Sequence, residues 1–346
     1  MTRQNGIDRR HFLKSAGLGL GVLAVGPGVS IVAPARAADK TKIVIKLDWL
    51  MSNGQIGDVM ALKHGFFEEA GFEVEFSPGG PNSATVPPVI SGAAALGQFS
   101  ETPQLFNARA SGVPVKILAC GFRTGPYAFA SLPKKPLRSL DDLPSMKIGI
   151  QPTGRFLLDA ILAKNEMDPS SVTAVNVGFD KAPLLRGEVD AIGGWITNTE
   201  ALSIIGDDRI DLLASDLGLP SYANVYFATD DAIEDNADVL AGYIGAAAKG
   251  WGWTYENPQE AVKQMVEAYP ALSLEWEMKT IDKILELSFD AATAANGWAA
   301  FDPASLEEQL SLYDRIGQYP NGRPKLEDVY TTKILEMTAD VRPKIG

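Results

Sequence analysis

Two hydrophobic periods alternate along the chain from residue 42 onward. Short apolar runs with strand character are separated by longer runs in which apolar residues recur at helical spacing. The predicted elements of the first series are strands at 42–47, 72–76, 95–99 and 115–119 and helices at 56–70, 86–91 and 102–111. This alternation predicts a parallel β-sheet whose strands are connected by helices.

A second series of the same kind begins near Leu137. Its predicted elements are a helical turn at 139–143, strands at 146–150, 172–177, 189–192 and 222–228, and helices at 154–165, 181–186 and 198–205. After Thr229 the pattern stays helical almost to the end of the chain.

The order of these series predicts two domains, one of which interrupts the other. Domain I comprises residues 38–130 and 229–346, and domain II comprises residues 131–228. The chain is expected to cross between them at 129–136 and again at 226–230. Because ligands of open α/β sheets bind outside the carboxyl ends of the strands, two such domains would form a cleft that closes by a hinge motion.

The first 37 residues have the pattern of an export signal. Residues 8–14 read D-R-R-H-F-L-K, which resembles a twin-arginine signal with its paired Arg9 and Arg10. A weakly apolar run at 16–32 contains Pro27 and five glycines, and Ala-Arg-Ala at 35–37 fits the small-x-small cleavage rule. This run is marginal for a membrane span, which requires about 20 apolar residues. We therefore expect cleavage after residue 37 and export to the periplasm.

Charge and composition narrow the classes of function. The whole chain has a net charge of -12, and loss of residues 1–37 would remove five basic side chains and one acidic side chain, which makes the rest more acidic still. An acidic surface excludes nucleic-acid binding, which needs a basic face. Cys120 is the only cysteine and is expected to be a buried apolar residue; His11 and His64 are the only histidines, and His64 is expected to be structural. We therefore predict no disulfide, no metal site, no cofactor and no catalytic residue.

Several local motifs carry a family resemblance. They are L-D-W at 47–49, A-L-K-H-G-F-F-E-E-A-G-F-E-V at 61–74, S-P-G-G at 77–80, L-D-D-L at 140–143 and G-E-V-D-A at 187–191. Together they resemble the substrate-binding proteins of ABC importers, in the branch that binds alkanesulfonates, nitrate-type anions and thiamine-precursor pyrimidines. The resemblance implies an α/β fold of the type II periplasmic binding protein class, a monomeric protein that binds a small molecule, and a membrane permease with its ATPase as partners.

Within that branch, Asp48-Trp49 and the run W-I-T-N-T-E at 195–200 resemble the pyrimidine-binding members. Residues 50–54 depart from the usual Pro-Asn-Thr, Gln55 stands where a histidine is often found, and the cysteine-rich motif of the eukaryotic pyrimidine synthases is missing. The resemblance implies capture of a planar nitrogen heterocycle of the aminopyrimidine type. A sulfonate such as taurine, riboflavin, and an exported enzyme on the same fold, such as a desulfinase, are the alternatives.

The candidate site residues follow predicted strands or begin predicted helices. Trp49 and Trp195 would stack on a flat ring, and Glu200 would accept from its amine edge. Other members have an equally good structural role: Thr102 as a helix cap, Gly79 and Gly80 as a turn, and Arg155 in a surface ion pair. The full predicted ligand-binding set is Asp48, Trp49, Asn53, Gln55, Gly79, Gly80, Glu101, Thr102, Thr153, Gly154, Arg155, Trp195, Asn198 and Glu200.

Overall fold

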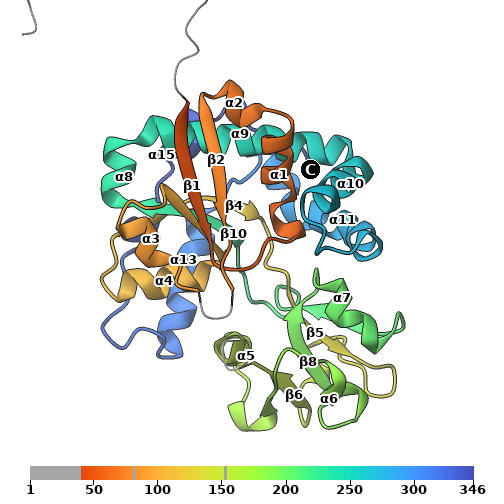
Figure 1. The fold of residues 1–346 in the computed structure, drawn as a ribbon. Coiled ribbons are helices and arrows are strands. Elements are labelled where there is room, and N and C mark those ends of the chain that lie inside the picture. The colour runs from red at the N-terminus through yellow and green to blue at the C-terminus, as the bar shows by residue number, and fades with distance from the viewer. Residues whose placement is uncertain (1–39, 81–82, 152–153) are drawn as a thin grey trace, which may run out of the picture. The chain divides into compact units, whose positions relative to one another are not determined.

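The strands of this protein form two mixed sheets, each covered by helices. A computed structural model describes residues 40–80, 83–151 and 154–346, so the predicted export signal at 1–37 lies outside the described residues. Residues Lys40–Gly346 form one compact unit. Within these described residues the strands make two five-stranded sheets, one in each of two lobes (Figure 1). This is the mixed α/β architecture expected from the sequence.

The first lobe is built on a sheet of order β2-β1-β3-β10-β4. Its strands are β1 (Thr41–Leu47), β2 (Phe72–Ser77), β3 (Leu96–Glu101), β4 (Val115–Phe122) and β10 (Ala223–Thr229). β1 pairs in parallel with β2 and β3, whereas β10 runs antiparallel between β3 and β4. The prediction of a purely parallel sheet is wrong here, because β10 enters from a part of the chain about a hundred residues away.

The second lobe is built on a sheet of order β7-β6-β8-β5-β9. Its strands are β5 (Tyr127–Ser131), β6 (Lys147–Ile150), β7 (Thr173–Asn176), β8 (Ala191–Trp195) and β9 (Ile210–Leu213). β5 pairs antiparallel with both β8 and β9. Neither β5 nor β9 was predicted, because neither is part of a regular strand–helix alternation.

These pairings shift the points at which the chain passes between the lobes. Since β5 belongs to the second sheet and β10 to the first, the crossings lie at 123–126 and 214–222, not at the predicted 129–136 and 226–230. The Gly125 N–H donates to the Ser221 carbonyl at 3.0 Å, so the two crossings run side by side. The division into two hinged domains stays a prediction, and we propose these paired crossings as its hinge.

The helices cover the sheets and extend the first lobe. Those before β10 are α1 (Ile56–Lys63), α2 (Phe66–Glu69), α3 (Val86–Ile90), α4 (Thr102–Ala110), α5 (Arg155–Lys164), α6 (Ala182–Leu185) and α7 (Thr199–Leu202). Those after it are α8 (Asp230–Asp235), α9 (Ala237–Glu256), α10 (Pro258–Ala268), α11 (Leu274–Ser288), α12 (Ala291–Asn296), α13 (Pro303–Arg315), α14 (Leu326–Val329) and α15 (Lys333–Met337). The single helix predicted at 56–70 is two helices, because Gly65 adopts a left-handed φ of 76° between them.

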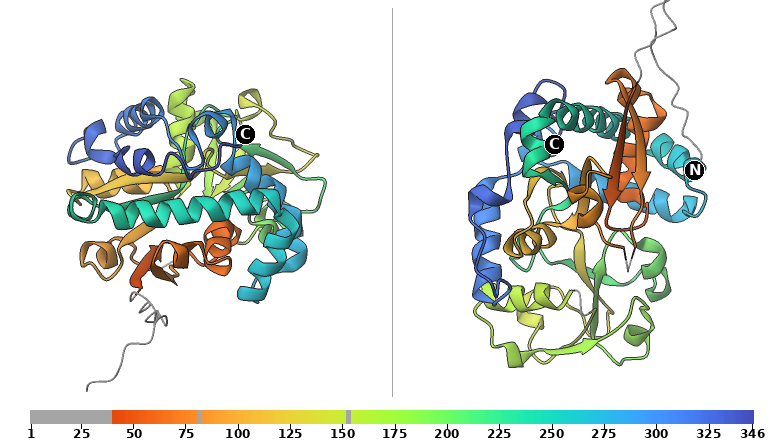
Figure 2. Two further views of the ribbon diagram at one scale, coloured as in Figure 1. Left: turned by 90° about the horizontal axis from the view of Figure 1, so that it is seen from above. Right: turned by 60° about the vertical axis from the view of Figure 1, so that its left-hand side comes forward.

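Helix α9 crosses the first lobe in direct contact with α1 (Figure 2). The contact is close because two glycines meet there: a Cβ at Gly250 would lie 2.1 Å from the Gly57 carbonyl oxygen, and a Cβ at Gly57 would lie 2.2 Å from the Trp251 ring. The next residue of α1, Asp58, is buried, and its carboxylate accepts hydrogen bonds from the Tyr226 and Tyr243 hydroxyls, at 2.7 and 2.8 Å. A buried carboxylate held only by neutral donors resists ionisation.

We expect Asp58 to make stability depend on pH. Burial raises the pKa of its carboxyl from 3.8 to about 6 in the folded state. Because the folded state then binds the proton more tightly than the unfolded state, the contribution of this group to the unfolding free energy falls as pH rises from about 4 to about 6. A shift of this size corresponds to a loss on the order of 2 to 3 kcal/mol. Urea unfolding of wild type and Asp58→Asn at pH 4 and pH 7 tests this. A difference between the two proteins that is the same at both pH values would contradict it.

Candidate functional site

The carboxyl ends of the central strands in both sheets carry the candidate side chains. In the first lobe, Trp49 follows β1 and Glu101 ends β3, and β1 and β3 are parallel neighbours with Leu47 opposite Gln98. In the second lobe, Gly154 follows β6 and Trp195 ends β8, again parallel neighbours. This is the edge at which open α/β sheets bind ligands.

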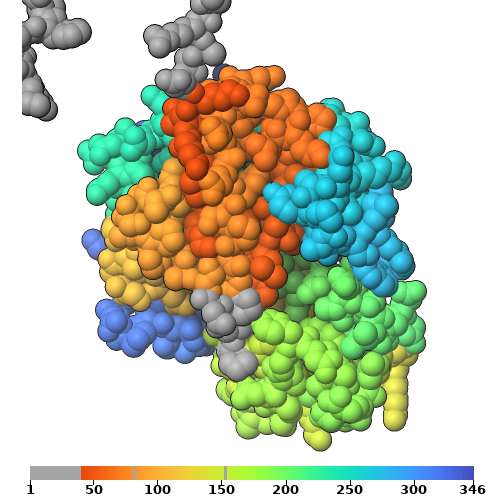
Figure 3. Space-filling model, in the orientation of Figure 1, coloured from red at the N-terminus to blue at the C-terminus, as the bar shows by residue number. Residues whose placement is uncertain are grey.

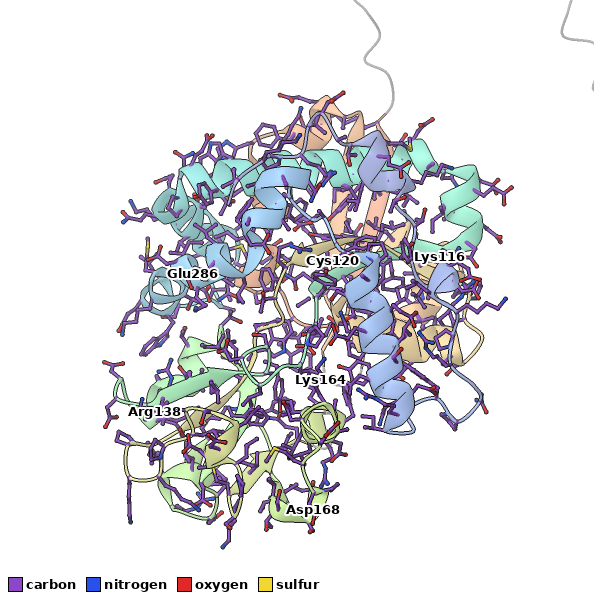
Figure 4. All side chains as sticks on the ribbon, turned by 180° about the vertical axis from the view of Figure 1, so that it is seen from behind. Lys116, Cys120, Arg138, Lys164, Asp168 and Glu286 are labelled. Atoms are coloured by element: carbon purple, nitrogen blue, oxygen red, sulfur yellow. The ribbon has the colours of Figure 1, made fainter. Side chains whose placement is uncertain are left out.

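The two lobes contact each other beside this edge. On one side α7 meets α11, where the Thr199 hydroxyl donates to the Trp276 carbonyl at 3.2 Å; Figure 3 shows the corresponding green and light-blue segments in contact. On another side Lys164 of α5, labelled in Figure 4, forms an ion pair with Glu308 of α13. Asn53, a predicted site residue, is buried and donates to the Thr197 carbonyl of the second lobe at 3.3 Å.

Two exposed aromatic side chains face each other from opposite lobes. Trp49 is 39% exposed, and Phe179, in the loop after β7, is 63% exposed. Their ring centroids are 5.9 Å apart at an interplanar angle of 43°. Large apolar side chains exposed in this way lower the free energy of the protein when a ligand covers them. Phe179 was not predicted; the signal was a lone aromatic residue in the polar loop G-F-D-K at 178–181.

Asp48, Gly79 and Gly80 fix the backbone that carries Trp49. One Asp48 carboxylate oxygen accepts from the Ser100 N–H at 2.8 Å and from the Gln104 side chain at 2.9 Å. The Gly79 N–H donates to the Trp49 carbonyl at 2.8 Å, and the Gly80 N–H donates to the Asp48 carbonyl at 3.1 Å. A Cβ at Gly79 would lie 2.4 Å from the Asp48 backbone. These three residues therefore position the tryptophan.

Glu101 is a buried carboxyl at the junction of β3 and α4. It is 7% exposed and is the N-cap of α4, in a capping box in which its N–H donates to the Gln104 side chain at 2.9 Å. Burial and the neighbouring Asp48 carboxylate raise the pKa of Glu101 to about 8. Its Oε1 atom has no hydrogen-bond partner among the described residues. A buried polar atom without a partner is rare and needs an explanation.

Tyr127 presents a second such atom from the other lobe. Its side chain is 6% exposed, and its hydroxyl also has no partner within the described part of the chain. The hydroxyl occupies space that two glycines leave open, since a Cβ at Gly193 would lie 2.3 Å from it and a Cβ at Gly154 would lie 2.7 Å from it. Gly154, a predicted site residue, thus makes room for a tyrosine that the sequence interpretation missed. The strand that carries Tyr127 was not predicted.

Trp195 lies half-buried at the end of β8, opposite Tyr127 of β5. It packs against two apolar clusters, one within the first lobe and one that contains residues of both lobes. Removal of this indole would therefore disturb both lobes. Its role as a second stacking surface stays a prediction.

Other predicted residues make structural contacts. Gln55 is buried and donates to the Gln98 side chain at 2.7 Å, and Thr102 is buried and donates to the Gln309 side chain of α13.

Arg155 is exposed and pairs with Asp159 one turn further along α5, at 2.8 Å. Asn198 is exposed and accepts from the Ala201 N–H at the start of α7. Thr153 lies outside the described residues.

Glu200 is exposed in the first turn of α7 and lies close to Glu277 of α11. The pKa of Glu277 is raised chiefly by burial and also by this neighbouring carboxylate. Glu200 thus lies where α7 of the second lobe meets α11 of the first lobe. Its predicted contact with a ligand amine stays a prediction.

Two further observations concern the remaining side chains of the described residues. Cys120, labelled in Figure 4, is buried in β4, and burial raises the pKa of its thiol. Within the same residues there is no group of three or more His, Cys, Asp or Glu side chains that could hold a metal ion, and no helix there is both long and apolar enough for a membrane span.

Relatives of known name share most of this chain. A protein of Haemophilus influenzae named for thiamine biosynthesis is 28% identical over 70% of this chain and 78% of its own length. The formylaminopyrimidine-binding protein of Halalkalibacterium halodurans is 25% identical over 79% of this chain and 84% of its own. A 4-amino-5-hydroxymethyl-2-methylpyrimidine phosphate synthase of Legionella pneumophila is 23% identical over 69% of this chain and 77% of its own.

The fold and the family model agree with these relatives. The periplasmic aliphatic sulphonate binding protein of Escherichia coli superposes with a TM-score of 0.64 at 16% identity, covering 86% of this chain and 99% of the other, which shows a shared fold. The family model described as NMT1/THI5 like matches residues 53–261, a range that includes both crossings and most of the candidate site. The chain therefore belongs to the NMT1/THI5-like family.

Proposed function

We propose that this protein is the solute-binding component of an ABC importer and captures a planar nitrogen heterocycle of the aminopyrimidine type. The observation that carries this proposal is the pair of exposed aromatic rings, Trp49 and Phe179, which face each other from opposite lobes at 5.9 Å. At this distance the two rings contact each other, so a flat ligand would stack between them after the two lobes move apart. The name of the formylaminopyrimidine-binding relative supports the same ligand class.

The acids of the site favour a heterocycle over a sulfonate. Asp48 and Glu101 lie close enough for the charge of one to raise the pKa of the other. Arg155, the cation predicted for an anionic ligand, is instead exposed and paired with Asp159. A sulfonate would therefore meet negative charge without a compensating cation from Arg155. A ligand with ring nitrogens and an amino group suits these carboxyls better.

The predicted export signal indicates where this function would take place. Arg9-Arg10 and the Ala-Arg-Ala at 35–37 support delivery to the periplasm through a twin-arginine route. There the protein would act as a monomer and hand its ligand to a membrane permease driven by an ATPase. The fold shared with the sulphonate-binding protein of Escherichia coli is consistent with this placement.

Binding is proposed to occur without chemical change of the ligand. His64, the only histidine beyond residue 37, is half-buried with its ring 4.0 Å from that of Trp253, away from the strand ends that carry the site. The synthase of Legionella pneumophila among the relatives makes turnover the alternative to test. Mass spectrometry of the ligand recovered after incubation distinguishes the two, because a binding protein returns it unchanged.

A thermal-shift panel tests the ligand class. The chain from residue 38 to 346 is incubated with 4-amino-5-hydroxymethyl-2-methylpyrimidine, formylaminopyrimidine, taurine or riboflavin. A ligand at a hundred times its Kd stabilises the folded state by about 2.7 kcal/mol. We expect a rise in Tm of several degrees with the two aminopyrimidines and none with taurine. A rise with taurine or riboflavin alone would contradict the proposal.

A further inference from the structure

Two buried polar atoms that have no hydrogen-bond partner among the described residues lie beside the chain crossings between the lobes. Glu101 Oε1 belongs to the first lobe, and the Tyr127 hydroxyl belongs to the second. Both side chains are more than nine-tenths buried. Gly125, in the first crossing, separates them along the chain, and a Cβ at Gly125 would lie 3.4 Å from Glu101 Oε1. The two atoms therefore belong to one region next to the proposed hinge.

We infer that Glu101 and Tyr127 read the hydrogen-bonding edge of the ligand, with Glu101 acting as a neutral carboxylic acid whose Oε1–H donates to a ring nitrogen. This assignment rests on the proposed function and deepens it, because it names the ligand atom that the first lobe recognises. The Tyr127 hydroxyl, which both donates and accepts, would pair with a neighbouring N–H of the same edge.

The groups around Glu101 favour the protonated form of its carboxyl. Asp48, after β1, adds negative charge, and the titratable groups that face Glu101 from β5 and α13 are the hydroxyls of Tyr127 and Tyr313. Among the described residues no ion pair reaches Glu101, and Arg123, in the adjacent crossing, is bound to Asp290 at 3.2 Å. Burial without a cation favours the neutral form.

The capping box decides which oxygen is available to the ligand. In the capping box the Glu101 carboxyl faces the N–H of Gln104 in the first turn of α4, which favours an acceptor oxygen there, although the side chain makes no direct cap hydrogen bond. In the proposed state the proton is on the other oxygen, Oε1, which has no partner in the part of the chain that the structure describes. A glutamine at this position would reproduce both properties, since its carbonyl accepts and its amide donates.

The test compares Glu101→Gln, Glu101→Ala and Tyr127→Phe by isothermal titration with 4-amino-5-hydroxymethyl-2-methylpyrimidine between pH 7 and pH 9.5. At pH 7 we expect Glu101→Gln to bind within about threefold of wild type. Glu101→Ala should bind at least about tenfold more weakly and Tyr127→Phe about fivefold more weakly, since each loses one hydrogen bond from a buried site. The Tm of each variant reports on its folding. Glu256→Gln, the same change at an exposed glutamate, is the matched control.

The pH profile separates a neutral acid from a carboxylate. Above about pH 8, where the pKa of Glu101 lies, wild-type affinity should fall by up to about tenfold per pH unit, while Glu101→Gln stays constant. A Glu101→Gln protein that binds as weakly as Glu101→Ala, or a wild-type affinity that is constant up to pH 9.5, would overturn this assignment alone. Failure of the wild type to bind either aminopyrimidine would overturn the proposed function itself, and this assignment with it.

Discussion

Replacement of Trp49 or Phe179 by alanine should weaken aminopyrimidine binding by about tenfold each, and by about a hundredfold or more together. Each ring is exposed without ligand and would be covered by it. Stacking contributes about 0.5–1.5 kcal/mol beyond the free energy of area burial, and about 1.4 kcal/mol corresponds to a factor of ten. Isothermal titration of both single variants and the double variant measures these losses.

Two controls make this result specific to stacking. Trp49→Phe keeps an aromatic face and should recover most of the affinity lost in Trp49→Ala. Leu185→Ala removes another exposed apolar side chain of the second lobe and should leave the Kd unchanged. Retention of affinity within twofold in the double variant would show that the two rings do not enclose the ligand.

Replacement of both Arg9 and Arg10 by lysine should abolish export of the full-length chain. The change keeps the charge of the segment, so a loss would reflect the requirement for paired arginines that defines twin-arginine signals. Fractionation of cells followed by immunoblotting measures the periplasmic share. N-terminal sequencing of the wild-type periplasmic protein should begin at Ala38 or within a few residues of it.

Arg3 provides the matched control for this experiment, because it lies in the same segment but outside the pair. Arg3→Lys should leave export unchanged. A doubly substituted protein that still reaches the periplasm would point to another export route. Full-length protein retained in the membrane would mean that residues 16–32 act as an anchor.

The acidic character of the site bears on the choice between ligand classes. Asp48 is held by Ser100 and Gln104, so it cannot rotate away from a ligand without breaking two hydrogen bonds. The carboxyl therefore keeps a fixed position in the first lobe, while burial raises its pKa above the usual value. After burial, Asp48 is the second cause of the raised pKa of Glu101, and in the proposed function the negative charge of Asp48 would also oppose an anionic ligand.

The architecture, and the position of Trp49 at a strand end, were predictable from local pattern. Strands such as Thr41–Leu47 and helices such as Arg155–Lys164 have clear hydrophobic periods, and Trp49 follows a strand whose carboxyl end is the usual ligand edge. Motifs such as G-E-V-D-A at 187–191 indicated the family. These signals lie within a few residues of one another along the chain, which is why they can be interpreted without tertiary contacts.

Tertiary structure alone decided the crossings and the partners of the site. β10 inserts antiparallel between β3 and β4, and β5 inserts between β8 and β9, and neither pairing leaves a periodic signal in its own segment. The approach of Phe179 to Trp49 and the space that Gly154 and Gly193 leave for Tyr127 join residues from separate segments. Such contacts depend on how two sheets are placed by packing, whereas hydrophobic periodicity reports only which face of an element is buried.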